Sequence, residues 1–187
     1  DFEPNPRKGI FAEINFIKSS RAWGSDFNFQ REINNKKIFY LVLPRIFSEL
    51  IFAGRVALTR ITGTIPFYEY RHIWSIDTPI YGLGGGTVLK GYRQDRFVGN
   101  VMGFGNFEIR YRFASLRMSD EYFTFQIVPS FELGRVWDSI YSINTNGYKY
   151  SQGMGLRIIW NQSTVISIDY AKSREGVQFF MNLNQNF

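Results

Sequence analysis

The chain has 187 residues, no cysteine and a formal net charge of +6, and these three values exclude several classes of protein. Its length suits a single domain, and the lack of cysteine excludes disulfides and thiol chemistry. The Lys and Arg residues are dispersed along the chain, so we do not expect nucleic-acid binding. No stretch approaches the roughly 20 consecutive apolar residues that a membrane helix requires.

Aromatic residues make up 18% of the chain, which is high for a soluble domain of this size. Aromatic girdles at the two interfaces of a transmembrane barrel would account for them. No charged-then-apolar leader stands at Asp1, so we expect that any signal peptide has already been removed. The mean hydropathy of −0.20 fits either a soluble protein or a barrel with one polar face and one apolar face.

Alternation of apolar and polar residues predicts eight strands. In chain order they span residues 8–19, 25–43, 50–61, 101–113, 122–137, 148–160, 164–171 and 177–187. The second is ambiguous because the run NNKK interrupts it: it is either one overlong strand or a hairpin. A hairpin would give nine strands, whereas single-chain bacterial barrels normally have an even number, so we favour eight.

Charged residues occupy only one face of most of these strands. The fourth strand places Phe107, Ile109 and Tyr111 on one face. Glu108 and Arg110 lie on the other, for about the ten residues needed to cross a bilayer. A soluble sandwich would have to bury the charged face or expose the aromatic one. We therefore predict an all-β fold, a closed antiparallel transmembrane β-barrel of eight strands that forms one domain over residues 1–187.

The end of the chain carries the same signal. Residues 177–187 alternate and stop on an aromatic residue, an ending typical of outer-membrane barrels and hazardous on a soluble edge strand. We expect an integral protein of a Gram-negative outer membrane, with both termini periplasmic and residues 1–7 as a periplasmic tail. The apolar positions expected to serve as a C-terminal sorting signal are Phe179, Met181, Leu183 and Phe187.

The longest connection, residues 63–100, is rich in glycine yet also carries Leu89, Tyr92 and Phe97. Such apolar residues argue against disorder, and long ordered loops are usually functional. We expect this external loop to fold into the barrel lumen, where an eight-stranded barrel leaves little room for an open pore.

Several segments, in this order, resemble the C-terminal barrel half of the BamA/TamA superfamily of outer-membrane assembly and secretion proteins: PFYEY, GLGGGTVLKGYRQDRFVGN, NFEIRYRF, FELGRVWD, QGMGLRI and the final Phe187. The resemblance covers nearly the whole chain from about Gly9. Members have sixteen strands and periplasmic POTRA domains, so this chain is similar to a short, POTRA-less member of the type called noNterm.

The resemblance implies that the loop tip docks onto an inward acidic residue of a later strand. The tip and its preceding glycines correspond to Gly84, Gly85, Gly86, Leu89, Lys90, Gly91 and Tyr92. The expected docking residues are Glu132, Gly134, Glu108, Arg110 and Arg96. Lys90 stands where the family has Arg, and Glu132 stands where it usually has Asp.

Alternation alone also places Glu132 in the lumen, where a lone carboxylate is costly without a cation. Lys90 is one candidate partner; the alternatives are Arg110, Arg112 and Arg157. Lys supplies a point charge in place of the planar fork of Arg, so its docking should be less strict in orientation.

A non-enzymatic role in outer-membrane organisation, or in assembly of barrel proteins or lipid, is the leading expectation. The alternative is a structural or lipid-binding barrel, dimeric through its lipid face, with Arg71, Arg93 and Arg96 near lipid phosphates. The expected partners are outer-membrane lipids including lipopolysaccharide, and the barrel-assembly machinery during insertion.

An enzyme acting on lipid is the third reading, and it would need the single histidine, His72, with Ser75 and Asp77 nearby in sequence. No spacing of metal ligands is present, and GLGGGT lacks the Lys and the following helix of a phosphate loop. We expect no metal and no cofactor.

Overall fold

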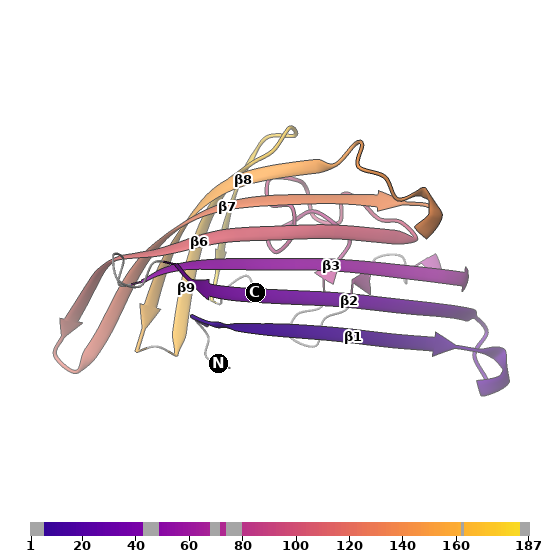
Figure 1. Ribbon diagram of the computed structural model, residues 1–187, viewed down its shortest axis with the longest axis horizontal. Coiled ribbons are helices and arrows are strands. Elements are labelled where there is room, and N and C mark those ends of the chain that lie inside the picture. Colours follow the sequence, from indigo (N-terminus) through magenta and orange to yellow (C-terminus); the bar gives the residue numbers. More distant parts are fainter. Residues whose placement is uncertain (1–5, 43–48, 68–71, 74–79, 162, 184–187) are drawn as a thin grey trace.

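The computed structural model describes residues 6–42, 49–67, 72–73, 80–161 and 163–183. Eight strands form one antiparallel sheet in the order β1-β2-β3-β6-β7-β8-β9-β10 (Figure 1). Their bounds are β1 Gly9–Ser19, β2 Asn28–Leu41, β3 Leu50–Thr64, β6 Val101–Met118, β7 Glu121–Trp137, β8 Lys149–Trp160, β9 Thr164–Lys172 and β10 Val177–Asn182. The short strands β4 (His72–Ile73) and β5 (Ile80–Tyr81) form a separate pair. The predicted all-β fold with eight main strands is confirmed.

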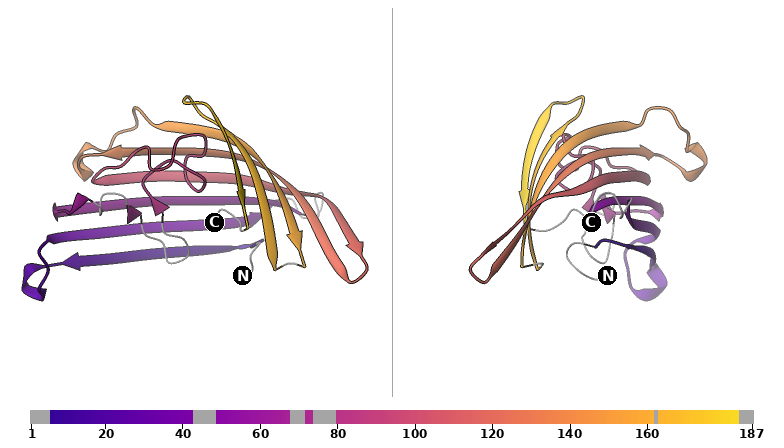
Figure 2. Two further views of the ribbon diagram at one scale, coloured as in Figure 1. Left: turned by 180° about the vertical axis from the view of Figure 1, so that it is seen from behind. Right: turned by 60° about the vertical axis from the view of Figure 1, so that its left-hand side comes forward.

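The sheet is strongly curved, and the segment between β5 and β6 lies in its concavity (Figure 2). Among the described residues β1 and β10 are the two ends of the sheet and do not pair with each other. The predicted closure into a barrel is therefore not seen in this part of the chain. The loop explains why the sheet does not close. A closed eight-stranded barrel has an interior just wide enough for side chains, whereas this concavity holds a folded loop.

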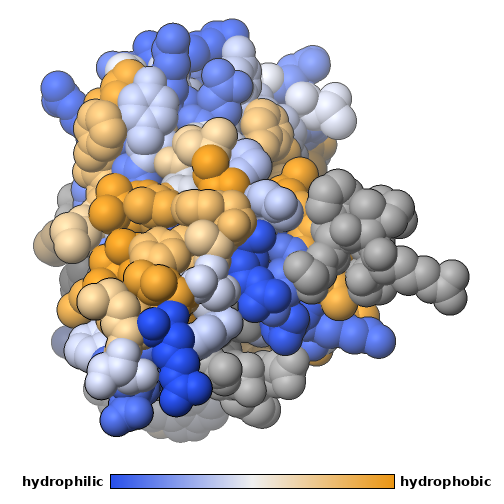
Figure 3. Space-filling view, turned by 90° about the vertical axis from the view of Figure 1, so that its left-hand side faces the viewer, coloured by the Kyte–Doolittle hydropathy of each residue, from blue (hydrophilic) through white to orange (hydrophobic). Residues whose placement is uncertain are grey.

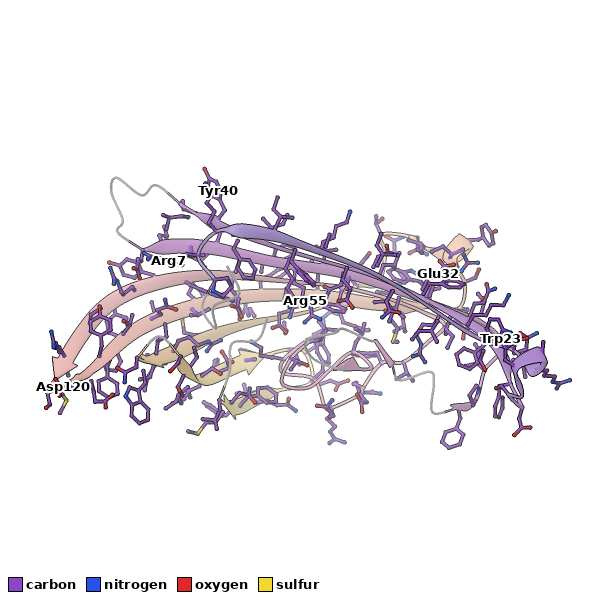
Figure 4. All side chains as sticks on the ribbon, turned by 90° about the horizontal axis from the view of Figure 1, so that it is seen from below. Arg7, Trp23, Glu32, Tyr40, Arg55 and Asp120 are labelled. Carbon is purple, nitrogen blue, oxygen red and sulfur yellow. The ribbon has the colours of Figure 1, made fainter. Side chains whose placement is uncertain are left out.

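Burial alternates along the strands in the sense opposite to that of a soluble sheet. On the concave side Arg55, Arg110 and Arg157 are buried. On the convex side large apolar residues such as Phe131 and Met154 are exposed. Figure 4 shows the same contrast, with Arg55 directed into the concavity and Tyr40 away from it. In the face seen in Figure 3, hydrophobic residues gather across the left and centre, with hydrophilic residues along the top.

The second strand is continuous: β2 pairs along its whole length with β1 and β3, so the NNKK hairpin does not form. Asn34 is opposite Ile14 on one side and Leu58 on the other. Its outward positions from Asn28 to Lys36 are polar, which is why the sequence pattern was ambiguous there.

The hairpin of β6 and β7 is longer than the sequence predicted. The predicted strands, 101–113 and 122–137, leave eight residues between them, but only Ser119 and Asp120 separate β6 from β7. Ser119 adopts a left-handed φ of 55°, which allows a two-residue turn. A bulge between Arg112 and Ala114 lets the strands bend before they project beyond the rest of the sheet (Figure 1).

Short 3-10 helices follow two of the strands: η1 (Arg21–Trp23) comes after β1, and η3 (Ile140–Ser142) comes after β7. No helix within the described ranges has the length and apolar character needed to cross a membrane.

Candidate functional site: the docked inner loop

Residues 82–97, named the inner loop here, fold into a compact hydrogen-bonded unit. Leu83 and Phe97 form a backbone bridge that closes it, with Leu83 N–H donating to Phe97 O at 2.8 Å. Inside it, Gly85 N–H donates to Tyr92 O at 3.1 Å. Gly85 has a φ of 111° and Gly91 a φ of 92°, conformations that favour glycine. The glycines singled out in the sequence are therefore the residues that let the chain fold back on itself.

The inner loop packs an apolar cluster against the concave face of the sheet. Leu83, Val88, Leu89 and Tyr92 are all buried, and they pack with Ala57 of β3 and with Met102 and Phe104 of β6. Burying side chains of this size contributes about 1.5–3 kcal/mol each. The loop is thus held by an apolar core of its own, in addition to the polar contacts at its tip.

Lys90, at the tip, lies between two carboxylates. Its Nζ is 3.4 Å from Glu132 Oε1 on β7 and 3.6 Å from Asp169 Oδ2 on β9. Its backbone N–H donates to Glu132 Oε2 at 2.6 Å, and Ser151 Oγ donates to the same oxygen at 3.3 Å. Lys90 and Glu132, the pair predicted from the sequence, are therefore in contact, through both the side chain and the backbone of Lys90.

The contact extends into a buried chain of ion pairs across four strands. Arg157 Nη1 on β8 lies 2.9 Å from Asp169 Oδ1, and its Nη2 lies 3.9 Å from Glu108 Oε1 on β6. Arg110 Nε completes the chain at 3.0 Å from Glu108 Oε2. Lys90, Arg110 and Arg157 supply three positive charges, and Glu108, Glu132 and Asp169 supply three negative ones. The buried cluster is therefore balanced in charge.

The charge state of Lys90 follows from the same neighbours. Burial lowers the pKa of Lys90, but the carboxylates of Glu132, Glu108 and Asp169 more than offset this, and the net pKa lies above the usual value. Lys90 is therefore an ammonium group over the physiological pH range, as an ion-paired docking residue must be.

Glycine at position 134 makes the close approach possible. A Cβ there would lie 2.9 Å from Leu89 Cδ1 and 3.1 Å from Leu83 Cδ1. The loop therefore presses its apolar residues directly onto the backbone of β7, beside Glu132. Gly86 lies similarly close to β10, where a Cβ would be 3.1 Å from Cδ1 of Phe180.

Replacing Gly134 with Ala should therefore destabilise the docked loop. We expect the free energy of unfolding to fall by about 1–3 kcal/mol, the usual cost of an extra methyl group in a packed core. Chemical denaturation followed by tryptophan fluorescence measures this change. Gly54→Ala is the matched control, because its Cβ would meet only ordinary contact, 3.4 Å from Phe52 Cε1. Equal stability of the two variants would contradict the close packing.

Further hydrogen bonds fix the flanks of the inner loop. Ser173 Oγ donates to Gly91 O at 2.6 Å, and Tyr92 Oη donates to Tyr150 O at 3.3 Å. Asn106 Nδ2 donates to Thr87 O at 3.2 Å.

Arg96, which we expected inside the lumen, lies instead at the rim of the sheet. It is about half exposed and pairs with Glu175 at 2.9 Å, in the turn between β9 and β10. Its guanidinium also lies over the ring of Phe97, 5.5 Å from the centroid. Arg96 therefore helps to tie the loop to that turn and takes no part in the buried ion pairs.

Asp169 is the site residue that sequence reasoning did not assign to docking. In residues 164–171 it alternates with Ile168 and Tyr170, so the pattern puts it on the inward face, where a second carboxylate in need of a cation could have been recognised. In the described part of the chain Glu132 forms no ion pair with the alternative arginines. Arg110 pairs with Glu108, Arg157 pairs with Asp169 and Glu108, and Arg112 pairs with Glu49 at 3.0 Å.

Of the remaining predicted residues that the structure describes, Arg93 is exposed within the inner loop and the others belong to other segments. Phe179, Met181 and Leu183 are exposed on or just beyond β10, and Phe187 lies outside the described residues. His72 is in β4, opposite Tyr81, while Ser75, Asp77 and Arg71 lie outside the described residues. In the described ranges no group of three or more acidic, His or Cys side chains is placed to hold a metal.

Comparisons of this sequence with protein-family models and with curated proteins find no match.

Proposed function

We propose that this chain is a small, non-enzymatic outer-membrane β-barrel protein of the BamA/TamA type that acts in membrane organisation or in assembly of barrel proteins or lipid. One observation carries the proposal: the sheet buries its ions and exposes its large apolar side chains. Water would favour the opposite arrangement, whereas a bilayer outside and a filled lumen inside favour this one.

The strand lengths and directions support a membrane setting. β3, β6, β7 and β8 each have 12 or more residues, enough for a tilted strand to cross the hydrocarbon layer. Because the eight strands alternate in direction, β1 begins and β10 ends at the same end of the sheet. We propose that this end faces the periplasm and that the inner loop enters from the outer surface.

The docked loop supports a role other than that of an open channel. Its apolar cluster and its ion pairs occupy the concave side of the sheet, where a channel would otherwise run. Such a protein would act through its wall and rim on the surrounding lipid or on other barrels.

The test of the assembly role is a refolding assay in lipid vesicles. A second, unrelated barrel protein is refolded with this protein already inserted, and the appearance of its heat-resistant compact form is timed. We expect faster refolding than with an inert barrel of equal size. Equal rates would exclude an assembly role, while recovery from the soluble fraction of cells would exclude the membrane location.

A lipid-binding role is the second candidate, favoured by basic residues gathered at the outer rim. Lys149 lies over the ring of Phe97 and Arg174 over the ring of Tyr150, at 5.9 and 5.5 Å, and both cations are exposed. Together with Arg96 they suit the phosphates of lipopolysaccharide. Lys149→Gln combined with Arg174→Gln should then reduce the lipopolysaccharide that copurifies with the protein. An unchanged amount would exclude this patch as the binding surface.

A further inference from the structure

The sheet has two edges that lack a strand partner among the described residues. β1 forms one edge and β10 the other. Each of these two strands is paired on one side only, whereas the six strands between them are paired on both sides. Exposed backbone N–H and C=O groups on a strand edge are costly in a bilayer, where no water can satisfy them. In the membrane setting proposed above, on which this inference rests, each edge must be paired.

Side-chain exposure shows the same gap. Outward apolar residues on strands that have a partner on both sides are only partly exposed, as in Phe131 of β7 at 45% and Ile168 of β9 at 40%. Ile14 on β1 and Phe179 on β10 reach 79% and 73%. The outward apolar face thus continues to both edges, with lateral room beside each for one more strand.

Self-closure would have to expel the inner loop. An eight-stranded barrel has no space for more than side chains, yet Leu83, Leu89 and Lys90 are fully buried on the concave side. Gly86 of the loop also abuts Phe180 of β10, one of the two strands that would have to move inward. A wider barrel would accommodate the loop without this conflict.

We infer that a second copy of this chain completes the barrel. β1 and β10 are antiparallel, because the strands alternate through an even number, so β1 of one copy can extend antiparallel beside β10 of another. A twofold axis makes the two seams identical and leaves no free edge. The product is a sixteen-stranded wall with two inner loops in its lumen, which would otherwise be wide enough for an aqueous channel.

Cysteine cross-linking tests this directly, since the chain has no cysteine of its own. Two differently tagged copies are coexpressed, one carrying Ile14→Cys and the other Phe179→Cys, and membranes are treated with a short thiol cross-linker. We expect a covalent species that carries both tags. Further pairs, Ile10→Cys or Phe16→Cys on β1 with Met181→Cys on β10, cover other registers in which the two edge strands can pair.

A single chain carrying both Ile14→Cys and Phe179→Cys separates the two ways of closing. If a second copy completes the barrel, this variant gives a covalent dimer. An internally cross-linked monomer would overturn the inference, and so would the absence of a cross-link at every register tested. Val56→Cys, outward and 54% exposed in the middle of the sheet, is the control for contact between faces and should not cross-link. A dimer that forms through Val56→Cys but not through the edge pairs would also overturn the inference. Fractionation keeps this result apart from the membrane proposal, because a cross-linked dimer in the soluble fraction would refute only the latter.

Discussion

Replacing Lys90 with Met should release the inner loop and cost about 3–5 kcal/mol of unfolding free energy, the usual effect of removing one partner of a buried ion pair. Met keeps most of the length of the side chain but leaves Glu132 and Asp169 without the ammonium group that lies between them. Denaturation in detergent or vesicles measures the loss of stability, and limited proteolysis shows whether the loop has become accessible. Lys90→Arg keeps the charge and should retain most of the docking.

Arg96→Met is the matched control for Lys90→Met, because it removes a cation from the same loop. Arg96 is half exposed, and exposed ion pairs are worth only about 0–1 kcal/mol. Equal effects of the two variants would mean that the buried pairs do not hold the loop. Adding Glu132→Gln to Lys90→Met completes a double-mutant cycle. If Lys90 and Glu132 interact as their contacts indicate, the double variant should be less destabilised than the sum of the two single variants.

The buried ion pairs are better understood as determinants of loop position than as a source of stability. Desolvation offsets much of the attraction within such pairs, and an apolar replacement of a whole cluster is often neutral. The apolar contacts of Leu83 and Leu89 supply stability without fixing orientation. The contacts of Lys90 with β7 and β9 select one position for the loop tip, because any other would take the ammonium group away from the buried carboxylate of Glu132.

Sidedness could be predicted from the sequence, since strict alternation leaves only two faces to choose between. Glu108, Arg110 and Glu132 fell on one face, and a carboxylate in that position required a cation such as Lys90. Gly134 follows Glu132 by two residues, on the same face of the strand, and its missing side chain also indicated a close approach of two backbones.

Other features depend on three-dimensional facts that alternation does not encode. The inner loop packs on the concave side of the sheet, and a count of eight strands alone does not predict that β1 and β10 are unpaired among the described residues. Arg96 was misplaced because a loop has no fixed period from which to infer the direction of its side chains. The length of the β6–β7 hairpin depended on a left-handed Ser119, a conformation that Ser adopts only infrequently.

Replacing Ile109 with Arg should separate a membrane sheet from a soluble one. Ile109 is outward, 45% exposed and in the middle of β6. A charge on the lipid face near the middle of a bilayer costs about 2–4 kcal/mol, whereas on a surface in water the same substitution is nearly neutral. Folding equilibria in lipid vesicles give the difference.

Tyr141→Arg provides the control for Ile109→Arg, since Tyr141 is 93% exposed in η3, beyond the end of the sheet. We expect its free energy of unfolding to stay within about 0.5 kcal/mol of the unmodified protein, the usual range for surface substitutions. If Ile109→Arg behaves like Tyr141→Arg in vesicles, the convex face does not contact lipid. The exposed apolar residues would then need another cover, and the membrane proposal would fail. A large loss at Ile109 alone would instead place hydrocarbon against the convex face, because no other solvent penalises a charge there so strongly.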